Sequence, residues 1–136
     1  MADLLIYTDG GARGNPGPAA CAAILVHEGK RIASNKTYLG DRCTNNAAEY
    51  EGLILGLTEA KKRGFAGKTI EVRMDSELIV RQMSGEYQIK EETLWPYYMR
   101  AHNLLVAHFP HARFVHVRRE QNEEADRLVN DAIDEA

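Results

Sequence analysis

The residues best suited to chemistry in this chain are four acidic side chains that stand where regular segments begin or end. Asp9 and Asp75 each follow a short apolar run that is typical of a buried strand. Glu49 and Asp126 stand in the first turns of two segments with helical periodicity. A single carboxylate at such a position usually caps a helix or forms a turn, but four that met in space would repel one another. Such a cluster needs divalent cations between its members, and it would suit metal-assisted chemistry on phosphate groups.

The surrounding pattern predicts the elements that would bring these acids together. Apolar and alternating runs predict strands over residues 4–8, 21–27, 31–39, 69–74 and 113–117. Helical stripes predict one helix that ends near Gly64, two more over residues 76–83 and 94–109, and a last one around residues 125–133. The order is strand, strand, strand, helix, strand, helix, helix, strand, helix. We therefore expect an α/β fold in one domain, residues 1–136, with helices packed on a five-stranded mixed sheet.

Composition sets further bounds on the partners and the compartment. The chain has 136 residues and a net charge of −3, so its bulk charge does not favour nonspecific binding to nucleic acid. Contacts with nucleic acid would have to come from a local positive face or from bridging metal ions. We find neither a signal peptide nor an apolar stretch long enough to cross a membrane, and we expect a cytoplasmic monomer without a protein partner. Cys21 and Cys43 are expected to be reduced thiols, with a disulfide between them as the alternative.

The four acids lie in four short motifs. Residues 8–18 read TDGGARGNPGP, residues 44–49 read TNNAAE, residues 75–76 read DS, and residues 122–126 read NEEAD. Each resembles a motif of ribonuclease H, type 1, and the four follow the order of that family. Each motif alone would be weak, but together they cover nearly the whole chain, which makes the resemblance specific.

The resemblance implies a ribonuclease H-like fold and an endoribonuclease that hydrolyses the RNA strand of an RNA–DNA hybrid, leaving 5′-phosphate and 3′-hydroxyl ends. Asp9, Glu49, Asp75 and Asp126 would be its catalytic, metal-binding residues. They would hold two Mg²⁺ ions, or alternatively Mn²⁺, about 4 Å apart around the scissile phosphate. One ion would generate the attacking hydroxide, and the other would stabilise the leaving oxygen.

The resemblance also implies which residues contact the RNA strand. Recognition has to distinguish RNA from DNA through 2′-hydroxyl groups in a wide minor groove. The matching positions are the backbone of Gly10 and the side chains of Asn15, Asn45 and Asn46. We expect the glycines after Asp9 to let the substrate backbone approach closely.

Four further positions are assigned to substrate binding. Arg42 and Thr44 match a pocket that holds a phosphate of the DNA strand, and Lys90 is a weaker match. Asn122 stands four residues before Asp126, on the same helix face, and is counted with them. The alternatives are that Thr44 only caps the following helix and that Arg42 and Lys90 are solvated surface charges.

The chain departs from the family pattern at several places. Many members carry a histidine in the loop before the last helix, but residues 117–122 read VRREQN, and His116 is expected in an ordinary strand position. Residues 84–93 are too few for the basic protruding helix with which some members grip the hybrid, so weak hybrid affinity is expected. The aromatic residues of the WPYY run, Trp95 among them, are expected in packing between elements rather than in a stacking surface.

Two other classes of function stay open on the sequence. One is a non-catalytic hybrid- or RNA-binding module that kept the fold. The other is a different nuclease on the same fold, such as an exonuclease or a strand-transfer enzyme. Clustered negative charge beside phosphates would not help a protein that only binds, so the four acids favour an enzyme.

Overall fold

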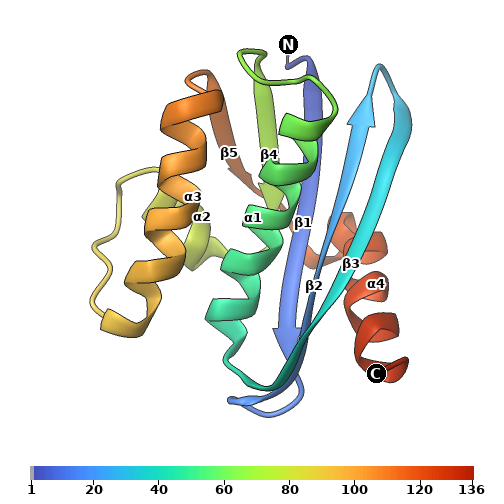
Figure 1. Cartoon of the computed structure of the whole chain (residues 1–136), viewed down its shortest axis with the longest axis vertical. Helices are drawn as coiled ribbons and strands as arrows, with labels where there is room; N and C mark the ends of the chain where they lie inside the picture. Colours follow the sequence, from blue (N-terminus) through green and yellow to red (C-terminus); the bar gives the residue numbers. More distant parts are fainter. Residues whose placement is uncertain (1) are drawn as a thin grey trace.

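The computed structural model describes residues 2–136 and confirms the predicted order of elements (Figure 1). The strands and helices are β1 (Leu4–Ala12), β2 (Gly17–His27), β3 (Lys30–Cys43), α1 (Asn45–Lys62), β4 (Ile70–Met74), α2 (Glu77–Met83), α3 (Trp95–His108), β5 (Ala112–His116) and α4 (Glu123–Asp134). Two short 3₁₀ helices, Glu92–Leu94 and Arg119–Asn122, lead into α3 and α4.

The five strands form one mixed sheet, as the sequence predicts, and their order in the sheet is β3-β2-β1-β4-β5. β2 pairs antiparallel with both β1 and β3, whereas β4 pairs parallel with both β1 and β5. The carboxyl ends of β1, β4 and β5 therefore lie at the same edge of the sheet. In sheets with parallel strands, this is the edge at which ligands bind.

β1 is longer than predicted. Its parallel pairing with β4 stops at Tyr7, but its antiparallel pairing with β2 continues as far as Ala12. Asp9 therefore lies inside the strand, opposite Ala22, and the prediction that it ends the strand is wrong. The pair Asp9-Gly10 favours a turn locally, but the long-range pairing with β2 overrides this preference.

The helices cover the sheet unequally (Figure 1). α1 packs on β1 and β2 and is flanked by α3, whereas α4 packs on the opposite face, against β2 and β3. The main core lies between the sheet and α1, α2 and α3, and its largest fully buried members include Tyr50, Phe109, Leu4, Ile6, Leu53, Leu57, Ile70 and Met74. A smaller cluster under α4 contains Ala20, Ala22, Val129 and Ala132.

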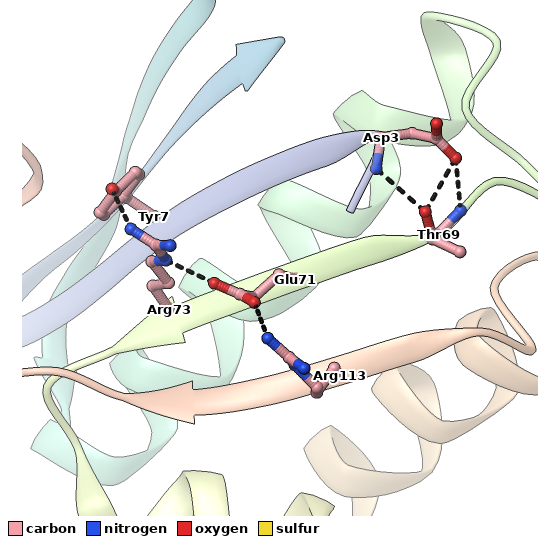
Figure 2. A network of polar contacts seen from close by, with 6 residues as sticks. All are labelled: Asp3, Tyr7, Thr69, Glu71, Arg73 and Arg113. Atoms are coloured by element: carbon pink, nitrogen blue, oxygen red, sulfur yellow. Dashed lines mark hydrogen bonds and ion pairs between the residues drawn. The ribbon is translucent and has the colours of Figure 1, made fainter. Parts of the chain in front are cut away.

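Polar side chains occupy the part of the second face that α4 does not cover, over β1, β4 and β5 (Figure 2). The Nε of Arg73 donates to Glu71 at 2.7 Å, and Arg113 donates to the other oxygen of the same carboxylate. Arg73 also donates to the hydroxyl of Tyr7 at 2.7 Å and lies over its ring. Glu71 is buried but paired on both oxygens, so this open face is stabilised without an apolar cover.

Three further expectations can be compared with the structure. Residues 84–91 form no helix, in agreement with the missing protrusion. Trp95 is 44% exposed, so the prediction that this side chain packs between elements is wrong. The adjacent Leu94 is buried in the core instead, and Trp95 points away from it. Both cysteines are free thiols, as predicted. Over residues 2–136, none of the helices combines the length and the apolar character that a membrane crossing requires.

Candidate active site

Three of the predicted carboxylates come together at the carboxyl edge of the sheet. Oxygen atoms of Asp9, Glu49 and Asp75 lie within 4.8 Å of one another. Asp9 is 5% exposed and Glu49 is 7% exposed, so neither carboxylate is freely solvated. Asp126 lines the same cleft from α4 but lies outside this tight group. The structure thus assembles three acids closely and places the fourth beside them.

Glu49 is placed by the way α1 begins. Thr44 caps the helix by accepting a hydrogen bond from the Ala47 amide at 3.2 Å. Glu49 follows in the second turn, and its Oε1 accepts a hydrogen bond from the Gly10 amide of β1 at 2.9 Å. Its Oε2 is buried and has no hydrogen-bond partner within the described part of the chain. A buried carboxylate oxygen without a partner is costly, unless a ligand such as a metal ion completes it.

Asp75 follows β4 directly, and the next residue caps α2. The hydroxyl of Ser76 accepts a hydrogen bond from the Ile79 amide at 3.3 Å. Ser76 thus caps α2, which leaves the Asp75 carboxylate available to the cleft.

Asp126 belongs to the first turn of α4, and Asn122 connects that helix to β1. The Nδ2 of Asn122 donates to the carbonyl oxygen of Thr8 at 2.9 Å. The pairing of β1 with β4 ends at Tyr7, one residue before Thr8. The Asn122 side chain therefore takes the place of β4 as the hydrogen-bond partner of the Thr8 carbonyl group. Asn122 therefore fixes the start of α4 next to Asp9.

The pKa values of the three grouped acids are all raised. Burial raises the pKa of Asp9 to about 7, and the negative charge of Asp75 adds to the effect. Burial and the charge of Asp9 hold the pKa of Glu49 well above its usual range. Burial also raises the pKa of Asp75, although the positive charge of Arg119 opposes the shift. Without a cation, these groups tend to hold protons rather than share a small space as carboxylates.

The donor set fits a hard divalent cation. Carboxylate oxygens are the ligands that Mg²⁺ prefers, and three of them converge here with one buried oxygen unsatisfied. A bound cation would favour the charged form of each acid and so remove the reason for the raised pKa values. The arrangement therefore suits a divalent cation held by carboxylates.

The centre lies in an open cleft of about 750 Å³. Its lining also includes Arg13, His116, Arg118 and Arg119, so positive side chains surround the acids. The sequence motifs give Arg13 no role and predict an ordinary strand position for His116. The pairing of His116 with Met74, just before Asp75, is what brings it to the cleft, and such a pairing between distant residues has no local sequence signal.

The residues predicted to contact RNA lie along the same cleft or support it. Gly10, Asn45 and Asn46 line the cleft. The Oδ1 of Asn45 accepts a hydrogen bond from the Ala12 amide at 2.8 Å, and the Oδ1 of Asn15 accepts one from the Asn45 amide at 3.0 Å. These bonds hold the loop after β1 against the start of α1, while the three asparagine side chains remain exposed.

The other predicted substrate-binding residues lie elsewhere. Arg42 and Thr44 are exposed at the junction of β3 and α1, and Lys90 is exposed between α2 and α3. None of the three lines the cleft. Asn122 is only 2% exposed and also lies outside the cleft lining, so its position supports a structural contact with Thr8 rather than contact with a substrate.

Comparisons with known proteins agree with this geometry. Residues 7–132 match the family model described as reverse transcriptase-like. A bifunctional protein of Mycobacterium tuberculosis is 43% identical over 98% of this chain and 36% of its own length. Ribonuclease HI of Halobacterium salinarum is 42% identical over 96% of this chain and 64% of its own length, so the chain spans only part of both relatives.

Solved structures show the same likeness. The crystal structure of LC11-RNase H1 in complex with an RNA/DNA hybrid has a TM-score of 0.93 and 46% identity over 97% of either chain. LC11-RNase H1 was isolated from compost by a metagenomic approach. Given this match and the sequence motifs in their order, the chain belongs to the type 1 ribonuclease H family.

Proposed function

We propose that this chain is a metal-dependent endoribonuclease that hydrolyses the RNA strand of RNA–DNA hybrids and leaves 5′-phosphate and 3′-hydroxyl ends. The observation that carries the proposal is the group of three carboxylates, with one buried oxygen unpartnered, in an open cleft. The hybrid bound to LC11-RNase H1 supports the substrate class. Two Mg²⁺ ions are the proposed cofactors, with Mn²⁺ as the alternative, and a cytoplasmic monomer is the proposed state.

The residues that would hold the cations are Asp9, Glu49 and Asp75, with Asp126 beside them. When bound, such ions lower the pKa of a water molecule and stabilise the charge that develops on a phosphate undergoing attack. The chain's own part is to hold the carboxylates together against their repulsion. It does so by anchoring Glu49 to the Gly10 amide and by freeing Asp75 from capping.

The side chains around the acids would position the nucleic acid. Arg118 and Arg119 supply the local positive charge that a chain of net charge −3 needs to approach phosphates, whereas Arg13 is already paired with Asp134 at 2.6 Å. Asn45 and Asn46 line the same cleft at the start of α1, where amide groups can reach 2′-hydroxyls in a wide minor groove. Arg42 and Thr44 lie outside the cleft lining, at the junction of β3 and α1, and we propose that they bind a phosphate of the DNA strand there.

A cleavage assay with labelled strands tests this function. RNA–DNA, RNA–RNA and DNA–DNA duplexes, each labelled on one strand at a time, are incubated with Mg²⁺ or with EDTA. We expect internal cuts in the RNA strand of the hybrid, with Mg²⁺ only, and no cleavage by the Asp75→Asn variant. Hybrid binding without any cleavage would favour the non-catalytic module instead, and stepwise products from one end would favour an exonuclease.

A further inference from the structure

α1 packs against β1 (Figure 1), and two glycines lie where their backbones approach each other closely. A Cβ added to Gly10 would overlap the carbonyl oxygen of Ala48 and lie 2.6 Å from the Glu49 nitrogen. A Cβ added to Gly52 would lie 2.5 Å from the carbonyl oxygen of Asp9. Each glycine thus faces backbone of the other element, and the two contacts lie on either side of the Asp9–Glu49 pair.

Backbone cannot rotate away from an added atom as a side chain can. The ordinary contact distance for a Cβ begins at 3.4 Å, so an alanine at position 52 would push the helix and the strand apart by about 0.9 Å (3.4 − 2.5). That displacement acts on the elements that carry Asp9 and Glu49. The hydrogen bond from the Gly10 amide to Glu49, 2.9 Å long, spans the same gap and would stretch with it.

Gly10 was expected to lack a side chain so that a substrate could approach. Its missing Cβ points instead at α1, because the atoms that it would meet belong to Ala48 and Glu49. The residue type at this position is therefore explained by the fit of helix to strand, whatever contact the backbone of Gly10 makes in the cleft.

We propose that Gly10 and Gly52 are positioning residues that set the α1–β1 separation at which Glu49 and Asp9 share one divalent cation. This inference rests on the proposed metal-dependent function. Metal sites require ligand distances within about 0.2 Å of their ideal values, so a shift of about 0.9 Å exceeds what the site tolerates. The same shift farther along the helix would only loosen the packing.

The chain offers a matched control on the same helix. Gly56 stands one turn beyond Gly52, and a Cβ there would lie 2.8 Å from Cγ2 of Ile6 and 3.0 Å from Cγ2 of Thr8. Both are side-chain atoms, and they belong to residues that precede Asp9 in β1. Gly56→Ala therefore tests crowding of the same interface without direct pressure on the backbone of Asp9.

The experiment compares wild type, Gly52→Ala and Gly56→Ala in three measurements. Calorimetry gives the Mg²⁺ affinity, thermal melts in EDTA give the stability, and NMR hydrogen exchange gives the protection of the Gly10 amide. We expect Gly52→Ala to lose at least tenfold in Mg²⁺ affinity and to lose protection of the Gly10 amide. We expect Gly56→Ala to keep both within about twofold, whatever its melting temperature.

Three results would overturn the inference. They are an unchanged Mg²⁺ affinity and Gly10 protection in Gly52→Ala, an equal loss in both variants, and a Gly52→Ala chain that does not fold, since the last two indicate a purely structural role. A wild type that binds no Mg²⁺ would instead refute the proposed function. The exchange of the Gly10 amide would still decide the positioning role, because it needs no cation.

Discussion

Two buried glutamates on neighbouring elements are treated in opposite ways by this fold. Glu71, on β4, has both oxygens bonded to arginines, which more than offset its burial and lower its pKa. Glu49, on α1, has carboxylates as its charged neighbours, one oxygen without a partner, and a raised pKa. Both carboxylate oxygens of Glu71 have hydrogen-bond partners within the chain, whereas Glu49 needs a ligand to satisfy its second oxygen.

This difference separates a structural acid from a functional one. A buried charge is tolerated when the chain supplies its partner, as in the network over β1, β4 and β5 (Figure 2). Where the chain gathers several acids and supplies no cationic side chain bonded to them, the missing charge has to come from a ligand. The two sites are therefore expected to respond oppositely to the same kinds of change.

The largest expected effect is the loss of cleavage in Asp75→Asn. Asparagine keeps the size of the side chain, and Ser76 still caps α2, so the melting temperature in EDTA should hardly change. Because loss of a mere supporting contact to a metal ligand costs roughly 10- to 100-fold, loss of a ligand should lower cleavage by more than about a hundredfold. Hybrid cleavage at a near wild-type rate in saturating Mg²⁺ would show that Asp75 is not a ligand.

The next effect is a contrast between Glu49→Gln and Glu71→Gln. Glu71→Gln removes the partner of Arg73 and Arg113 and should lower the free energy of unfolding by about 1 kcal/mol, since Arg113 is largely exposed. In Glu49→Gln the uncharged amide replaces an acid that burial and repulsion keep protonated, and its oxygen can still accept the hydrogen bond from the Gly10 amide. This variant should therefore be at least as stable as wild type in EDTA. Urea denaturation with and without Mg²⁺ measures both.

Only Glu71→Gln should keep the stabilisation that Mg²⁺ gives to wild type. If both variants lost stability equally in EDTA, Glu49 would be a structural acid like Glu71.

A third effect is the pH dependence of stability. The folded-state pKa of Asp9, about 7, lies above its ordinary value of 3.8, so the folded chain binds this proton more tightly than the unfolded chain does. In EDTA, the free energy of unfolding should therefore fall as the pH rises from about 4 to about 7, by about 3 kcal/mol. Saturating Mg²⁺ should abolish this fall, whereas Asp9→Asn should only reduce it, because the pKa values of Glu49 and Asp75 are raised as well. Melting curves across pH check it, and a stability that rises over this window in EDTA would contradict it.

The smallest effect concerns Arg42 and Thr44, which lie outside the cleft. If they hold a DNA-strand phosphate, the double change to alanine should raise KM several-fold with kcat less affected. The loss of the Thr44 cap should also cost about 1 kcal/mol of stability. Steady-state kinetics with a melt separate the two roles, and an unchanged KM with a lowered melting temperature would leave Thr44 as a cap only.

Local patterns predicted much of this molecule, and the exceptions share one cause. The order of elements and the four acids follow from periodicity and motifs. The extent of β1, the cleft position of His116 and the bond from Asn122 to Thr8 depend on pairings between residues far apart in the chain. The exposure of Trp95 depends on which of two adjacent apolar side chains, Leu94 or Trp95, takes the core position. No local pattern records such choices.

The most direct test of the claim that the acid cluster is completed by cations is a calorimetric titration of Mg²⁺ at about pH 6, between the ordinary and the raised pKa of Asp9. The titration is made in two buffers with different enthalpies of ionisation, which reports the protons released on binding. We predict that Mg²⁺ binds with net proton release, and that Glu49→Gln weakens binding and reduces the release while Glu71→Gln changes neither. Absence of binding, or binding without proton release, would contradict the claim.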